Sequence, residues 1–219
     1  MNHFPLTRKL VDREKFILDF CSGKNVLHLG CADWPFTENR LKDGTWLHSK
    51  LTVAASACIG VDLDRDAVVM LKEKHGIENI IEGNAEKLGD LNIGGFDVVV
   101  AGEIIEHLNN PGLLLESAKT VLRPGGKLLV TTTNAYCLRR FIRIPFGKES
   151  IHPDHTCYFS HRTLEALAMR YGYSLTGKYS YRITNTKPFF PYLVEAIATV
   201  ITPNWGEGIV HVYTCQVSV

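Results

Sequence analysis

Two stretches of the 219-residue sequence bring together side chains that can move a proton. One is HPDHTCYFSH, which starts at His152 and also contains Asp154 and His155; the other is EIIEHL, which contains His107. Imidazole titrates near neutral pH, so a well-placed histidine can accept a proton from a reacting group. We predict that His155 or His107 is the general base, because two histidines and an acid in one segment favour catalysis over a structural role.

The EIIEHL stretch also allows a second interpretation, a site for a divalent cation. On a helix, Glu103, Glu106 and His107 would fall at positions i, i+3 and i+4, on one face. Together with His155 they would supply two oxygen and two nitrogen ligands. Mixed oxygen and nitrogen spacing alone has many false matches, so our prediction contains no metal.

The stretch NVLHLGCADWPF, residues 25–36, has the pattern of a strand that runs into a glycine-containing loop. A dinucleotide-binding loop, G-x-G-x-x-G, needs its second glycine so that the backbone can approach a pyrophosphate. Here Ala32 and Trp34 follow Gly30 instead, which disfavours NAD and FAD. S-adenosylmethionine carries no phosphate, and a loop with one glycine, a small Ala32 and Asp33 as partner for an ammonium is compatible with it.

Polar residues also follow the next two predicted strands. Asp62 ends one of them, where its carboxylate can accept hydrogen bonds from both hydroxyls of a ribose. The alternative role, capping the next helix, fits Asp64 or Asp66 better. Asn84 and Ala85 are placed to flank an adenine ring, and the alternative there is a simple turn.

Segments with strand and helix patterns alternate along the chain, which predicts βαβ crossovers. We expect a Rossmann-like doubly wound α/β sheet, mostly parallel with an antiparallel C-terminal edge strand, in which ligands bind at the carboxyl ends of the strands. The expected helices are 6–20, 46–56, 67–76, 113–122, 160–172 and 189–201, and the expected strands are 25–30, 58–64, 77–83, 96–102, 127–134, 173–185 and 208–219. We expect a single domain, with an N-terminal helix in 1–24, a cofactor-binding core in 25–135 and a substrate-side region in 136–219.

The length and composition indicate a folded domain of the size of an enzyme. With 24 basic and 23 acidic residues the net charge is +1, so no overall field favours nucleic acid or an anionic membrane. Six scattered cysteines without a C-x-x-C pair indicate reduced thiols rather than a zinc site or a disulfide framework. The N-terminus lacks the apolar core of a signal peptide, and the longest apolar run contains Glu195 and is too short for a membrane span. We expect a cytoplasmic location.

The segments VLHLGCAD, GVDLD, GNAEKL, FDVVVAGEIIEHL and LRPGGKLLVTTTN, in this order, resemble the class I S-adenosylmethionine-dependent methyltransferases, over roughly residues 25 to 135. The chain departs from that family at His28, where an acid is usual, and at Ala32 and Trp34; Trp34 would either wall the pocket or pack in the core. The resemblance implies that Gly30, Cys31 and Ala32 line the methionine part of the cofactor, that Asp62 takes the ribose, that Leu63, Asn84 and Ala85 border the adenine, and that Glu103 faces the ligand.

The resemblance implies methyl transfer from S-adenosylmethionine to an oxygen, or less favourably a nitrogen, of a small metabolite, sugar or glycan. An alternative is a metal-assisted RNA 2′-O-methyltransferase, because Glu103, Glu106, His107 and His155 are similar to the metal-binding set of the terminal small-RNA enzymes. The chain lacks an extended basic and aromatic surface, so nucleic acid is the less favoured partner. A third alternative is a non-catalytic, cofactor-binding partner subunit.

Two segments near the C-terminus bear on the methyl acceptor. LRRFIRIPFGK places Arg139, Arg140, Arg143 and Lys148 beside the predicted crevice, where they would bind an anionic acceptor or else form a solvated face. The apolar helix 189–201 has three open roles, namely a lid, a homodimer contact, or a surface for a lipid-linked acceptor.

Overall fold

The computed structural model describes residues 9–147, 149, 152–182 and 190–215. They form an eight-stranded sheet in the order β1-β7-β8-β6-β5-β2-β3-β4. The strands are β1 (Leu10–Val11), β2 (Asn25–Leu29), β3 (Ala57–Asp62), β4 (Ile80–Glu82), β5 (Phe96–Gly102), β6 (Leu122–Thr133), β7 (Tyr173–Tyr181) and β8 (Gly208–Cys215).

All paired strands run parallel except β8, which is antiparallel to both of its neighbours, β6 and β7. The predicted mostly parallel sheet with an antiparallel C-terminal strand is therefore confirmed. In detail, β8 lies between β6 and β7, and the two-residue β1 takes the outer position beside β7.

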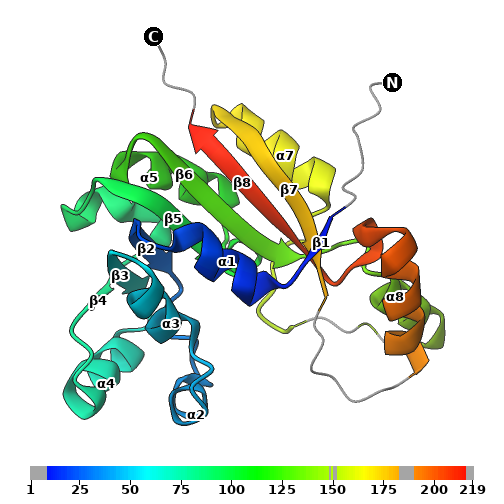
Figure 1. The fold of residues 1–219 in the computed structure, drawn as a ribbon, viewed down its shortest axis with the longest axis horizontal. Helices are drawn as coiled ribbons and strands as arrows, with labels where there is room; N and C mark the ends of the chain where they lie inside the picture. The colour runs from blue at the N-terminus through cyan, green and yellow to red at the C-terminus, as the bar shows by residue number, and fades with distance from the viewer. Residues whose placement is uncertain (1–8, 148, 150–151, 183–189, 216–219) are drawn as a thin grey trace.

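Helices cover both faces of the sheet (Figure 1). They are α1 (Arg13–Cys21), α2 (Thr37–Lys42), α3 (Leu47–Ala54), α4 (Arg65–His75), α5 (Pro111–Val121), α6 (Leu138–Arg143), α7 (His161–Arg170) and α8 (Phe190–Ile201), with 3-10 turns η1 (Ala85–Leu91), η2 (Ile105–His107), η3 (Ile144–Phe146) and η4 (Pro203–Trp205). Successive residues of β5 enter opposite cores: Val98 and Val100 pack with α1 and α3, whereas Val99 and Ala101 pack with α5 and α7. Burial on both faces explains the nearly continuous apolar sequence of this strand.

The first helix differs from its prediction. It begins at Arg13 rather than at residue 6, because the Asp12 side chain accepts a hydrogen bond from the Lys15 backbone and so caps the helix there. Leu10 and Val11 pair with β7 instead. This start places Arg13 at the end of the helix that approaches the carboxyl ends of the strands.

The predicted strand 127–134 begins earlier than expected, since β6 starts at Leu122, whereas the predicted ends of the helix 160–172 agree closely with the structure. Ser160 caps α7 in a reciprocal arrangement with Thr163, and Gly172, just beyond the helix, has a φ of 74°. The predicted apolar helix near the C-terminus is α8, which has 12 residues. Within the described part of the chain, helices fall short of the length and apolar character required to cross a membrane.

Candidate functional site

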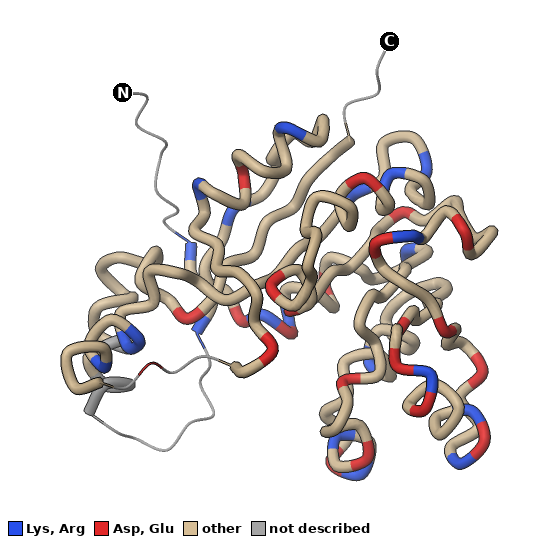
Figure 2. The backbone as a smooth tube through the Cα atoms, turned by 180° about the vertical axis from the view of Figure 1, so that it is seen from behind, with Lys and Arg blue, Asp and Glu red and all other residues tan. Residues whose placement is uncertain are grey.

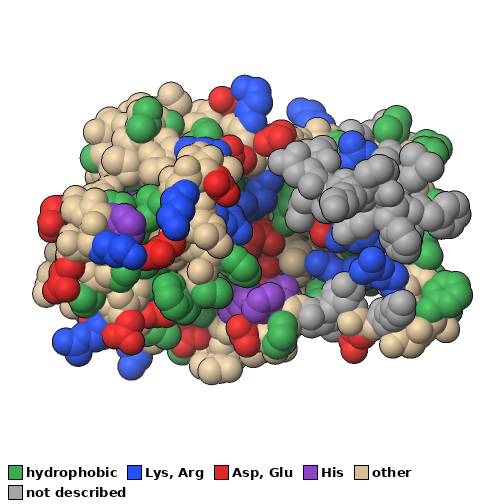
Figure 3. All heavy atoms as spheres, turned by 90° about the horizontal axis from the view of Figure 1, so that it is seen from below, with side chains coloured by type: hydrophobic (Ala, Val, Ile, Leu, Met, Phe, Trp, Pro, Cys, Tyr) green, Lys and Arg blue, Asp and Glu red, His purple; other side chains and the backbone are tan. Residues whose placement is uncertain are grey.

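A cavity of about 430 Å³ opens at the carboxyl ends of β2, β3 and β5. Figure 3 shows this face hollowed between two parts of the molecule, with acidic, basic and histidine side chains gathered in the hollow. The position agrees with the rule that open α/β sheets bind ligands where the central strands end.

The loop after β2 forms one wall of the cavity. Gly30 has a φ of 67°, and its backbone N–H donates to the Val61 carbonyl at 2.9 Å. A side chain at this position would be strained, and its Cβ would lie 3.3 Å from Cδ1 of Ile104. The buried Trp46 indole donates to the Cys31 carbonyl at 2.8 Å and fixes the next residue of the loop. Glycine is thus required at position 30. The other glycines of a dinucleotide-binding loop are replaced by Ala32 and Trp34, and the turn forms without them.

Asp62 lies at the end of β3 and borders the cavity. Its Oδ2 accepts the Ala32 backbone N–H at 2.8 Å, and its Oδ1 accepts the Asp64 N–H at 3.0 Å. Each carboxylate oxygen can accept a further hydrogen bond. Asp64 caps α4 by accepting from the Ala67 backbone, as the alternative role for an acid in this stretch predicted.

The residues predicted to border an adenine lie beside Asp62 or after β4. The Leu63 side chain is 69% exposed next to Asp62. Asn84 accepts a hydrogen bond from the Glu86 backbone and caps η1, and Ala85 is buried. These three residues are absent from the lining of the cavity as described, so their contact with adenine stays a prediction.

Arg13 enters the cavity from α1 and was missed by sequence reasoning. Its Nε donates to Thr131 Oγ1 at 2.9 Å, and Thr131 in turn donates to Glu103 Oε1 at 2.8 Å. The Arg13 Nε lies 3.5 Å from the same Glu103 oxygen. Because 118 residues separate Arg13 from Thr131, no local pattern in the sequence indicates this contact.

Charged and titratable groups also line the β2 wall. Asp33, predicted to meet an ammonium, borders the cavity, where its carboxylate lies 2.6 Å from Arg40 Nε and burial raises its pKa. His28 Nδ1 lies 3.3 Å from His48 Nδ1. Burial, then the His48 ring, hold the pKa of His28 well below its ordinary value, so this residue is neutral. Trp34 is 58% exposed and lines the cavity, so it forms part of the wall rather than of the core.

The helical face predicted for EIIEHL is wrong. Glu103 has a φ of 55° and lies outside any helix, and only Ile105–His107 form a single 3-10 turn. Glu106 is fully buried, accepts from the Thr133 backbone at 3.3 Å, and has a pKa raised well above its usual range, mainly by burial. Consequently the set Glu103, Glu106, His107 and His155 is not among the metal-ligand groupings found in the described residues.

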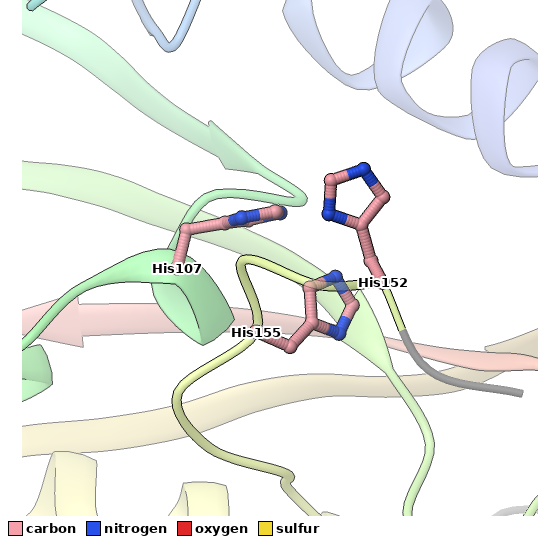
Figure 4. A group of neighbouring side chains, drawn as sticks. All are labelled: His107, His152 and His155. Atoms are coloured by element: carbon pink, nitrogen blue, oxygen red, sulfur yellow. The ribbon is translucent and has the colours of Figure 1, made fainter. Parts of the chain in front are cut away.

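The structure gathers a different set of three histidines instead (Figure 4). His107, His152 and His155 each have a ring nitrogen within 4.8 Å of the others. His107 and His152 line the cavity, whereas His155 is half-buried behind them. Burial lowers the pKa of His107, and burial with the neighbouring rings lowers that of His155 to about 4. Both predicted base candidates therefore lie together and are neutral at physiological pH.

Two of the arginines that were predicted to bind an anion, Arg139 and Arg140, have different surroundings in the structure. Arg139 is 7% exposed and forms an ion pair with Glu207, which is 6% exposed. Arg140 donates to the Asn134 carbonyl at 3.4 Å and lies over the Tyr158 ring at 5.6 Å. Lys148 lies outside the described residues. Arg139 is thus a structural group, not a ligand for an anionic acceptor.

A family model described as a methyltransferase domain matches residues 5–177. The chain belongs to this methyltransferase family. The resemblance to class I S-adenosylmethionine-dependent methyltransferases is therefore confirmed, and with it the predicted cofactor of the family.

Individual relatives agree with this family. This chain is 30% identical to a Mycolicibacterium smegmatis protein named "probable S-adenosylmethionine-dependent methyltransferase". The match covers 62% of this chain and 46% of the relative. The chain is 27% identical, over 59% of its length and 51% of the relative's, to a ubiquinone biosynthesis O-methyltransferase of Paraburkholderia phymatum. The chain spans about half of the length of these curated relatives.

A solved structure supports the fold. Magnesium protoporphyrin IX methyltransferase of Synechocystis PCC 6803, solved with bound S-adenosylhomocysteine, has a TM-score of 0.59 to this chain at 12% identity, covering 93% of this chain and 82% of that one. At this level of identity the likeness extends to the arrangement of sheet and helices.

Proposed function

We propose that this chain transfers the methyl group of S-adenosylmethionine to an oxygen of a small molecule. One observation carries the proposal: Asp62 and the pair His107 and His152 line the same cavity. The names of the ubiquinone biosynthesis relatives support oxygen as the acceptor atom. We call the wall that contains Gly30, Asp33 and Asp62 the cofactor side, and the wall that contains His107 and His152 the acceptor side.

The residues of the cofactor side fit the cofactor. Asp62 retains acceptor capacity for two ribose hydroxyls, since each oxygen is engaged by one backbone N–H. Arg13 and Asp33 carry opposite charges on the same cavity, which matches the carboxylate and the ammonium of a zwitterionic tail. The Gly30 turn leaves its backbone without a side chain on this wall.

S-adenosylmethionine supplies an electrophilic methyl group on its sulfonium when bound. The acceptor side has to orient a hydroxyl oxygen toward that methyl and remove its proton. The new O–C bond forms as the S–C bond breaks, with the bonding pair left on sulfur. The neutral His107, which borders the cavity, is the group best placed to take the proton, and His155 lies behind it.

Location and assembly remain predictions. We propose a cytoplasmic enzyme, because the six cysteines are scattered along the sequence and four of them are buried, as is usual for a protein of a reducing compartment. Figure 2 shows Lys and Arg interspersed with Asp and Glu along the described backbone, which supports a small-molecule acceptor over RNA. A homodimer contact stays one of the open roles of α8.

Calorimetry with S-adenosylmethionine and S-adenosylhomocysteine tests the cofactor, and transfer of a labelled methyl to a panel of small hydroxyl compounds, amines, glycans and RNA tests the acceptor. We expect both cofactor forms to bind and label to appear on a hydroxyl compound. The methyltransferase proposal fails if neither form binds. Binding without transfer to any member of the panel would favour the non-catalytic subunit, and label only on an amine or on RNA would reassign the acceptor.

A further inference from the structure

Three imidazoles from two segments converge beside the cavity (Figure 4). The His107 and His155 ring centroids are 4.5 Å apart, and each lies 5.5 Å from that of His152. Their candidate ligand nitrogens lie within 4.8 Å of one another. A neutral imidazole has one nitrogen with a lone pair that can bind a metal ion, so three rings at this spacing form a candidate ligand set.

The two segments are tied together next to these histidines. The Thr156 backbone N–H donates to the Glu106 carbonyl at 2.9 Å, and the Thr156 hydroxyl donates to the Leu108 carbonyl at 2.7 Å. His107 and His155 are thus each adjacent in sequence to a residue of this junction. The His155 N–H also donates to the His152 carbonyl at 3.1 Å, which holds the third histidine in the same turn. These contacts hold the backbones of the three histidines next to one another.

An acidic group accompanies the cluster. Asp154 lines the same cavity, and its carboxylate lies 3.7 Å from Nδ1 of His152. Carboxylate partners of this kind orient metal-binding imidazoles and favour a positive charge beside them.

We propose that His107, His152 and His155 bind one divalent cation of the zinc type, with its open coordination position facing the cavity. A tetrahedral site with Zn–N distances of about 2.1 Å places ligand nitrogens about 3.4 Å apart. The rings must therefore close by about 1.5 Å, which rotation of the exposed His152 side chain allows. Three protein ligands and one open position are the usual composition of a catalytic zinc site.

This cation site defines a class of acceptor, an inference that rests on the proposed function. Three neutral imidazoles do not neutralise the charge of the cation, and Asp154 offsets only part of it. The site therefore favours an acceptor with an oxygen that can become an anion, such as a phenol or an enol. The cation lowers the pKa of that hydroxyl, and its proton passes to water. When the cation is bound, His107 is one of its ligands, and water replaces it in the role of proton acceptor that is proposed above for the site without a cation.

Two titrations of metal-stripped protein test the site. Calorimetry monitors the titration with Zn²⁺, and visible absorption monitors the titration with Co²⁺. We expect one ion per chain, with binding at least about 100-fold weaker in His152→Ala and in His155→Ala. His75→Ala, which changes an exposed histidine on α4, is the matched control and should bind as the wild type does. Because His152 is exposed, its variant should fold, which circular dichroism checks. Absence of binding, or binding equal in His152→Ala and the wild type, would overturn the site.

Methyl transfer by the same samples tests the acceptor role. We expect chelation to abolish transfer to a phenolic acceptor and Zn²⁺ to restore it, while affinity for S-adenosylhomocysteine is unchanged. Full activity after chelation would overturn the acceptor role of the cation. If the wild type binds Zn²⁺ but does not bind S-adenosylhomocysteine, the proposed function is contradicted and the cation site is still supported.

Discussion

The cofactor side and the acceptor side of the cavity are anchored by different kinds of contact. On the cofactor side, Asp62 is held by backbone N–H groups of Ala32 and Asp64, within one sheet edge. On the acceptor side, the histidines belong to a 3-10 turn and a loop that meet through Thr156. The first arrangement follows from strand ends that lie side by side, whereas the second needs two distant segments to meet.

The largest expected effect concerns a buried ion pair outside the described cavity lining, between α6 and the residue before β8. Arg139 in α6 and Glu207 before β8 are both buried, so Glu207→Ala removes a charged partner from a buried arginine. We expect the free energy of unfolding to fall by about 3 to 5 kcal/mol. Urea denaturation measures it, with Glu116→Ala on the exposed surface of α5 as control. A loss below about 1 kcal/mol would show that this ion pair is dispensable.

The next largest effect concerns cofactor affinity and the role of Asp62 on the cofactor side. Asp62→Ala should weaken S-adenosylhomocysteine binding by about 1.5 to 3 kcal/mol, the scale of hydrogen bonds to a charged group. Calorimetry measures the affinity, and Asp66→Ala, which alters the exposed first turn of α4, should leave it unchanged. Equal affinity in Asp62→Ala and the wild type would remove Asp62 from the ribose site.

Two buried histidines outside the described cavity lining, His48 and His161, make the stability of the fold sensitive to low pH. Burial lowers the pKa values of His48 and His161 to about 4, so the unfolded chain binds more protons than the folded chain between about pH 6.5 and 4. Stability is therefore full above pH 6.5 and is lost as the pH falls through this window. Each histidine should remove roughly 1.5 to 2 kcal/mol of unfolding free energy between pH 7 and pH 5.

Unfolding of His161→Gln at both pH values checks this assignment. The ring of His161 contacts His211 Nε2 at 2.8 Å and Ser180 Oγ at 3.1 Å, and Lys178 is the nearby charge. The variant is expected to be less stable at pH 7 and to lose less stability on acidification. The same loss on acidification in the variant and the wild type would exclude His161 as a source of the acid sensitivity.

The two sides also differ in how far the sequence predicted them. Gly30 and Asp62 were found because a strand pattern identifies its own end, and strand ends of a parallel sheet share one edge. Glu103 was misplaced because its left-handed backbone, with a φ of 55°, interrupts the helical spacing assumed for EIIEHL. His152 was recognised as a neighbour of His155 but not as a partner of His107, since that contact is created by the tertiary fold. Arg13 was missed for the same reason.

The smallest expected change in stability comes from Trp34, and it is informative because Trp46 lies in the same segment. Trp34 is 58% exposed on the cavity wall, whereas Trp46 is 1% exposed and donates to the Cys31 carbonyl. Trp34→Ala should change the free energy of unfolding by no more than about 0.5 kcal/mol, and Trp46→Ala should lower it by about 3 to 5 kcal/mol. If Trp34 walls the bound ligands, its variant should nevertheless raise KM for the acceptor or weaken cofactor binding. A Trp34 variant that loses stability like Trp46→Ala, or that leaves both binding constants unchanged, would contradict that role.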